Sequence, residues 1–133
     1  MTHLLDTSVC SQPIKVRPLP GALESWQKLG SGAATSAVCL AEIEWGLFKN
    51  PSPRRWEGYH RDILPSVTCL LPDRETWTRF ARMKARQHQL GRPVADLDLL
   101  IAATAVHHNL ILATLDVRHF TAIEGLRWED WSV

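Results

Sequence analysis

Four acidic residues lie where apolar stretches of this chain end or turn, and they are the side chains with the clearest chemical use: Asp6, Glu42, Asp98 and Asp116. A carboxylate beside buried surface is costly unless opposite charge compensates it, and one divalent cation can compensate several carboxylates. Oxygen ligands suit Mg²⁺ or Mn²⁺, and the chain has no clustered Cys and His of the kind that binds zinc. The acids therefore predict a metal site, and a bound metal would lower the pKa of a coordinated water.

Each of these acids also has a purely structural interpretation. Asp6 precedes Thr7 and Ser8, whose hydroxyls could orient its carboxylate, but the same residue types cap turns and helices. Glu42 could be a solvated surface acid, and Asp116 an ordinary turn aspartate. The placement of the acids near strand ends or helix starts favours one shared cause over separate explanations.

The stretch from Asp96 to Val106 is apolar almost all round and predicts a buried helix with two acids in its first turn. The helix dipole favours negative charge there by a few tenths to about 1 kcal/mol, which accounts for Asp96 near the helix start. Asp98 shares a face with Ala102 and Ala105 and points at a crowded surface of small residues. We therefore predict Asp98 as a metal ligand and Asp96 as its auxiliary.

Short apolar runs alternate with stretches of helical periodicity along the chain. The predicted strands are residues 4–5, 33–36, 67–71 and 110–114, and the predicted helices are residues 21–29, 37–48, 53–64, 73–90 and 96–108. This alternation predicts an α/β fold with helices on both faces of a parallel sheet. Ligands of such sheets collect outside the carboxyl ends of the strands, where Asp6 and Asp116 fall. The proline-rich segment 12–21 is predicted as an ordered loop or lid.

Length and composition predict a soluble globular protein whose residues 1–133 form a single domain. The chain is 45% hydrophobic and 22% charged, and it lacks an apolar run of the roughly 20 residues that a membrane span needs. Its first residues do not resemble a signal peptide, so we expect a cytoplasmic protein with reduced cysteines. The net charge of +1 gives no global attraction to nucleic acid, so polyanion binding would need a local patch.

One candidate for such a patch lies between residues 76 and 92, which contain five basic residues and no acid. The helical spacing of Arg79, Arg82 and Arg86 could present them to the phosphates of a nucleic acid, although a solvated helix face would have the same pattern. A second, weaker basic group is Arg54, Arg55 and Arg61.

Two features near the carboxyl end bear on the site and on the sheet. His119 lies three residues after Asp116 and is a marginal further candidate for the acidic site. Trp128 and Trp131 could cover an edge of the sheet or a partner surface.

Five sequence motifs together resemble a known family. They are L-L-D-T-S-V at 4–9, A-E-I-E-W-G at 41–46, G-R-P-V-A-D-L-D-L-L-I-A-A-T-A at 91–105, A-T-L-D-V-R-H-F at 113–120 and G-L-R-W-E-D-W at 125–131. In this order they resemble the PIN-domain ribonucleases, specifically the VapC-type toxins of toxin–antitoxin pairs. The resemblance extends from end to end of the chain, and the motif at 91–105 is its most specific part.

This resemblance implies a PIN-like α/β fold, a small parallel β-sheet of four to five strands sandwiched between α-helices. It also implies a catalytic, metal-binding set, Asp6, Glu42, Asp98 and Asp116, with Thr7, Ser8 and Thr114 close by. The implied activity is endonucleolytic cleavage of RNA with Mg²⁺ or Mn²⁺. The implied partners are a second copy in a homodimer and a small antitoxin whose tail enters the acidic cleft. Two departures from the family are the proline-rich segment 11–20 and the additional acid Asp96.

Two other functions are compatible with clustered acids. A non-catalytic binding module could use the same acids to hold a basic partner tail instead of a metal. A magnesium-dependent phosphatase is the other, but a phosphoaspartate enzyme would carry D-x-D-x-T at its first strand, and this strand ends in Asp-Thr-Ser.

Overall fold

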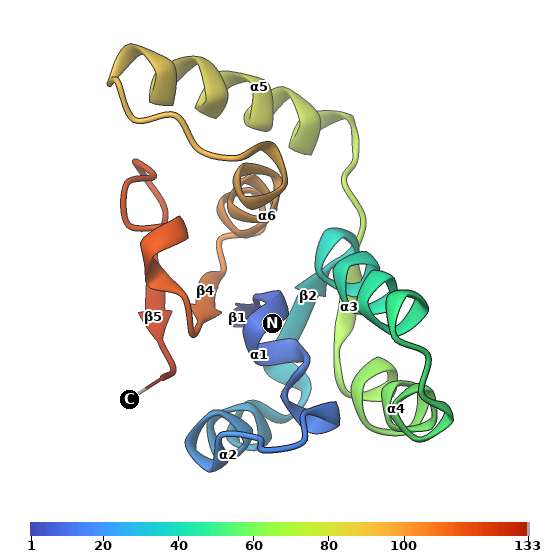
Figure 1. Cartoon of the computed structure of the whole chain (residues 1–133). Helices are drawn as coiled ribbons and strands as arrows, with labels where there is room; N and C mark the ends of the chain where they lie inside the picture. Colours follow the sequence, from blue (N-terminus) through green and yellow to red (C-terminus); the bar gives the residue numbers. More distant parts are fainter. Residues whose placement is uncertain (133) are drawn as a thin grey trace.

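A computed structural model describes residues 1–132 and contains a five-stranded sheet in the order β3-β2-β1-β4-β5, shown in Figure 1. The strands are β1 (His3–Leu5), β2 (Ala33–Ser36), β3 (Thr68–Leu70), β4 (Ile111–Thr114) and β5 (Trp128–Asp130). Each neighbouring pair is parallel, and the register pairs Leu5 with Thr35 on one side and with Ala113 on the other. The predicted α/β fold is therefore confirmed.

Helices cover both faces of this sheet. They are α1 (Thr7–Cys10), α2 (Pro20–Leu29), α3 (Ala37–Lys49), α4 (Pro53–Gly58), α5 (Arg74–Gln89) and α6 (Asp96–His107). Short 3-10 turns occupy Gln12–Ile14, Gly30–Gly32, Leu64–Ser66 and Val117–His119, and a π-helical turn, Tyr59–Ile63, extends α4. No helix formed by residues 1–132 combines the length and apolar character needed to cross a lipid bilayer.

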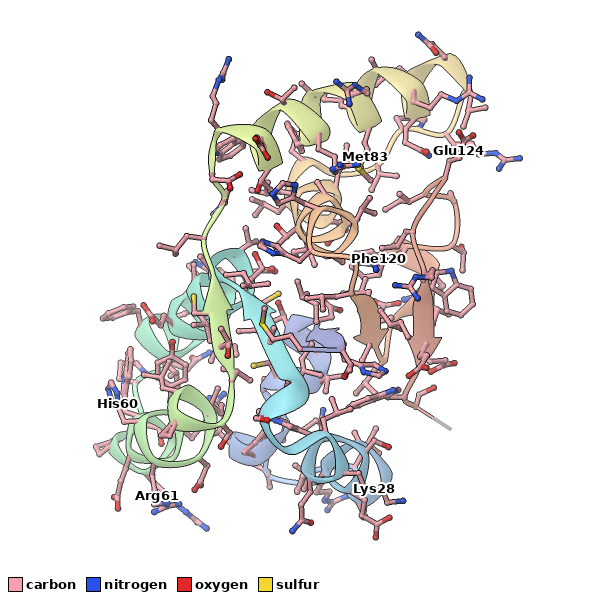
Figure 2. The ribbon with its side chains drawn as sticks, turned by 180° about the vertical axis from the view of Figure 1, so that it is seen from behind. Lys28, His60, Arg61, Met83, Phe120 and Glu124 are labelled. Carbon is pink, nitrogen blue, oxygen red and sulfur yellow. The ribbon has the colours of Figure 1, made fainter. Side chains whose placement is uncertain are left out.

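Alternating side chains of the strands divide the apolar interior into two cores, as expected for a sheet buried on both faces. Leu5 packs with residues of α1, α2 and α3, whereas Leu4 packs with residues of α6. Phe120, from the turn after β4, is buried in the second core and lies beside α6 in Figure 2. This packing fixes β1 at the centre of the sheet and α6 against one of its faces.

The structure differs from the sequence prediction in three elements. Thr7–Cys10 forms a four-residue helix, and Trp128–Asp130 forms the edge strand β5, neither of which the periodicity predicted. The helix predicted over 53–64 ends as an α-helix at Gly58 and continues as the π-helical turn. The prediction that Trp131 covers a sheet edge is close to the structure, because its backbone N–H donates to the Thr114 carbonyl at 2.9 Å and its side chain is buried.

Gln87 joins α5 to two loops, the one before α6 that contains Arg92 and the one before β5 that contains Ala122 and Glu124. Its fully buried side chain donates to the carbonyls of Arg92 and Ala122, at 3.0 and 2.8 Å, and accepts from the backbone N–H of Glu124 at 3.0 Å. These three bonds satisfy backbone groups that the adjoining loops leave without partners in regular structure.

We expect Gln87→Leu to destabilise the fold by roughly 2–4 kcal/mol, because it leaves three backbone polar groups beside an apolar side chain. The matched control is Gln89→Leu, an exposed position on the same helix, for which we expect a change within about 0.5 kcal/mol. Urea unfolding measures both changes. Equal midpoints for the two variants would contradict this role of Gln87.

Candidate functional site

The parallel strands place the candidate acids along one edge of the sheet. Asp6 directly follows β1, and Asp116 lies two residues after the end of β4, the neighbouring strand. The backbone N–H of Asp6 donates to the carbonyl of Ala113 at 2.9 Å, so the chain stays beside β4 where the carboxylate emerges. Glu42 comes from α3, which starts directly after β2, and Asp98 lies in the first turn of α6.

Asp6 is a buried carboxylate with only 7% of its surface exposed. Its Oδ2 atom accepts hydrogen bonds from Thr114 Oγ1 at 2.8 Å and from Ser8 Oγ at 3.1 Å. Burial raises the pKa of Asp6 above its ordinary range, these hydrogen bonds and one from the Thr7 backbone oppose the rise, and the charge of Asp98 adds to it. The carboxylate is thus held in place by hydroxyl donors without a cation in contact among residues 1–132.

Thr114 links two of the acids. Its hydroxyl donates to Asp6 and accepts from the backbone N–H of Asp116 at 2.9 Å. Ser8 supports the same network, because its oxygen accepts from the backbone N–H of Leu115 at 3.0 Å. The two hydroxyls therefore set the positions of Asp6 and of the chain leading to Asp116.

Glu42 is half-buried on α3 and faces the start of α1. Its Oε1 atom accepts from the Thr7 hydroxyl at 3.1 Å. Burial raises the pKa of Glu42, the Thr7 hydrogen bond opposes this, and the negative charges of Asp6 and Asp98 raise it further. Glu42 thus belongs to the same electrostatic cluster as the aspartates, and the alternative that it is a fully solvated surface acid is wrong.

His119 joins Asp98 to Asp116. Its Nδ1 atom lies 3.1 Å from Asp98 Oδ2, and its Nε2 atom lies 3.2 Å from Asp116 Oδ2. Arg118 approaches the second carboxylate from the other side, with Nε 3.1 Å from Asp116 Oδ1. The spacing of His119 from Asp116 is the sequence signal that pointed to this residue, whereas nothing in the sequence pointed to Arg118.

Asp96, predicted as an auxiliary of Asp98, contacts a different residue. It forms an ion pair with Lys84 of α5 at 3.0 Å, and both side chains are largely exposed. Residues two apart on a helix do not face the same way, which is why the two acids of this turn have different surroundings.

The predicted RNA-binding arginines of α5 do not converge on the acids. Arg86 pairs with Glu124 at 3.2 Å. Arg79 and Arg82 line a hollow with His107, the last residue of α6. Nine residues separate His107 from Asp98 on that helix, or about 14 Å at the usual rise. Contact of these arginines with RNA stays a prediction.

The donor set fits a hard divalent cation. The charge of Asp98 raises the pKa of Asp6, the charges of Asp6 and Asp98 raise the pKa of Glu42, and the ligand atoms of these residues are carboxylate oxygens. Within residues 1–132, however, no three acidic, His or Cys side chains converge closely enough to form a complete ligand shell. In this arrangement His119 lies between the two carboxylates that such a shell would bring together.

Comparisons with known proteins agree with the fold. A profile of the PIN domain matches residues 3–126. The chain is 32% identical to a protein from Shigella flexneri named tRNA(fMet)-specific endonuclease VapC, with 99% of each chain covered. Its fold is similar to that of DNA-bound VapBC from Salmonella typhimurium, with a TM-score of 0.88, 27% identity and 98% of each chain covered. It is also similar to VapBC-5 from Mycobacterium tuberculosis, described as a member of a family of toxin-antitoxin systems, with a TM-score of 0.70, 26% identity and coverage of 97% and 96%.

The raised pKa of Asp6 predicts that Asp6→Asn stabilises the fold at neutral pH. Folding favours the protonated carboxyl, so this stabilisation is complete below the pKa of the unfolded chain and is lost as pH rises through the folded-state pKa. The neutral amide should escape that loss. Urea unfolding in the presence of a chelator, at about pH 4 and about pH 7, should show a higher free energy of unfolding for Asp6→Asn than for the wild type only at the higher pH. Glu24→Gln, an exposed acid on α2, is the control, and an Asp6→Asn variant that is less stable at neutral pH would refute the prediction.

Proposed function

This chain belongs to the PIN-domain family, and from that premise we propose that it is a metal-dependent endoribonuclease and the toxin of a type II toxin–antitoxin pair. The observation that carries the proposal is the buried Asp6 carboxylate at the sheet edge, whose pKa is raised further by the charge of Asp98. A site that concentrates negative charge in this way is suited to a cation that in turn contacts a phosphodiester. The names of the relatives, which describe RNA-cleaving enzymes, support RNA as the substrate.

We infer that Asp6, Glu42, Asp98 and Asp116 would hold Mg²⁺ or Mn²⁺. The bound ion would supply charge compensation for the phosphate and a lowered pKa for the attacking water. For Asp98 and Asp116 to act together in this way, the His119 ring must leave the space between their Oδ2 atoms.

The surrounding residues of the chain have separate roles in this proposal. Thr114 and Ser8 keep the Asp6 carboxylate oriented and, by their hydrogen bonds, favour its ionised form. Thr7 orients Glu42, and the burial and nearby negative charges that raise the pKa of Glu42 are the cost that a bound cation would offset. Arg118 contacts Asp116 and fixes one of its oxygens.

We further propose a cognate antitoxin and a second copy of the chain as partners. The VapBC description of the similar structures supports the antitoxin. Trp45 and Phe48 expose 65% and 70% of their surface on α3, which supports a partner surface on that helix. A non-catalytic module that holds a basic tail is less well supported, because the relatives are named as ribonucleases and endonucleases.

Cleavage of single-stranded RNA with Mg²⁺ or Mn²⁺ tests the proposed function. We expect Asp98→Asn to lower kcat/KM by at least about 100-fold, since it removes a charge from the acid cluster. Asp96→Asn in the same helical turn should change it by less than about threefold, because Asp96 pairs with Lys84. RNA cleavage that persists in a chelator and in Asp98→Asn would refute the mechanism.

The Thr114 hydrogen bond predicts a shift in the pH dependence of cleavage. Thr114→Val removes a donor that lowers the pKa of Asp6, so the pKa of Asp6 should rise. Because the ionised acid is the active form, the acid limb of the kcat/KM profile should move to higher pH. Thr104→Val is the matched control, since the hydroxyl of this buried threonine of α6 bonds only the Leu100 carbonyl among residues 1–132. An acid limb unchanged in Thr114→Val would contradict this role.

A further inference from the structure

A basic pocket of about 350 Å³ lies between the turn that follows α1 and the beginning of α4. Four cationic side chains line it, Lys15 from the turn and Arg54, Arg55 and Arg61 from α4 and its extension, and no acid is among its lining residues. Figure 1 shows α4 beside this turn, and Figure 2 labels Arg61 at the outer surface. This concentration of positive charge is unusual for a chain whose net charge is only +1.

Most of this positive charge is free for a ligand. Arg61 is compensated by Asp62 at 2.9 Å and by Glu57 at 3.4 Å. Lys15, Arg54 and Arg55, by contrast, make no ion pair and no side-chain hydrogen bond with any residue from 1 to 132. Uncompensated cations gathered around one hollow favour an anionic ligand there.

The pocket is built on close packing. A Cβ atom at Gly58 would lie 2.9 Å from Ile14 Cγ2, so the absence of a side chain lets α4 approach the turn closely. The buried Gln12 side chain holds the turn in place, because it donates to the Ser8 carbonyl and accepts from the Leu19 backbone N–H, both at 2.9 Å. Lys15 is therefore presented to Arg54 and Arg55 by an ordered segment.

The same segment connects the pocket to the acidic edge, which is the end of the sheet where Asp6, Glu42, Asp98 and Asp116 lie. Helix α1 begins directly after Asp6 and carries Thr7 and Ser8, and the turn with Lys15 follows it. The axial rise of α1 is about 6 Å and that of the 3-10 turn Gln12–Ile14 is about 6 Å, so the pocket lies on the order of 12 Å along the chain from the acidic edge. Three or four stacked nucleotides of a single strand cover about that distance.

Without a bound cation the acids Asp6, Glu42, Asp98 and Asp116 repel an RNA strand, so cationic side chains elsewhere on the protein are needed to hold the strand. On α5, Lys84 and Arg86 are compensated by Asp96 and Glu124. Arg79 and Arg82 lie near the opposite end of α6 from Asp98. The basic pocket, by contrast, brings together three cations without ion pairs within residues 1–132, Lys15 from the segment after α1 and Arg54 and Arg55 from α4.

We propose that the basic pocket binds a backbone phosphate of the RNA substrate, a few nucleotides away from the phosphate that is cleaved at the acidic edge. This inference rests on the proposed ribonuclease function. Arginine guanidinium groups match phosphate oxygens in a bidentate fork, and Lys15 adds a third positive charge from the facing segment. The contact is to the backbone, so it strengthens binding of any sequence without selecting the cleavage site.

The test measures binding of a fluorescent 12-nucleotide single-stranded RNA to full-length protein in the Asp98→Asn background, which separates binding from cleavage. Each phosphate contact to a single strand contributes about 0.7 to the slope of log affinity against log salt. Arg54→Ala/Arg55→Ala removes two of the three charges on this one phosphate and should therefore lower the slope by about 0.7 and weaken binding roughly 5-fold at about 0.1 M salt. Lys15→Ala, from the other wall of the pocket, removes the third charge on the same phosphate and should lower the slope by less than about 0.7 and weaken binding by less than roughly 5-fold.

The matched control is Lys28→Ala/Arg74→Ala, which removes two exposed charges from α2 and α5 and should leave the slope unchanged. Figure 2 shows Lys28 projecting well away from Arg61. Circular dichroism and urea unfolding confirm that each variant is folded, and alanine favours the helical positions of Arg54 and Arg55.

Three outcomes would overturn the proposal. If the pocket and control variants weaken RNA binding equally, the effect comes from the net charge of the protein and not from the pocket. Unchanged RNA binding in the pocket variants would refute the phosphate site. Unchanged RNA binding together with a lost affinity of these variants for a poly-glutamate peptide would assign the pocket to an acidic protein partner. Failure of the ribonuclease function is distinguishable, since the wild-type protein would then leave RNA uncut while the binding result still stands.

Discussion

The structure depends on placing the carboxylate of Asp6 at the buried carboxyl edge of a parallel sheet. Only 7% of this residue is exposed, so desolvation acts against its charge, and hydrogen bonds from Thr114 and Ser8 offset part of that cost. Each donor comes from an element that must be correctly packed before the bond can form, β4 for Thr114 and α1 for Ser8. The negative site is therefore a product of the assembled core.

The distribution of charge matters more in this protein than its sum. The net charge of +1 conceals an edge where the charge of Asp98 raises the pKa of both Asp6 and Glu42, and a pocket where three cations lack partners among residues 1–132. Other charges are neutralised locally, as in the pairs of Lys84 with Asp96 and of Arg86 with Glu124. An RNA strand that meets both regions would gain affinity at one and be cleaved at the other, which separates binding from chemistry on one small surface.

Sequence reasoning predicted the elements with long or strongly apolar patterns and missed the shortest ones. The buried helix that carries Asp98 was predicted within one residue of its observed limits, because its apolar character persists over three turns. The four residues of α1 are too few to show a period. The edge strand β5, with the sequence Trp-Glu-Asp, has no apolar run, and its residues are exposed or half-buried because the strand lies at the edge of the sheet.

The sequence by itself determined which acids stand at strand ends, and that these acids resemble those of a metal-dependent ribonuclease, because both follow from residue type and position. Tertiary structure alone decided which partner each acid meets. Asp96 and Asp98 share one helical turn, yet one contacts Lys84 and the other His119. Likewise, Lys15 and Arg54 form one pocket although 38 residues intervene, since close packing at Gly58 brings their segments together. Such contacts depend on helix orientation and on long-range packing, which a single sequence does not encode in any local pattern.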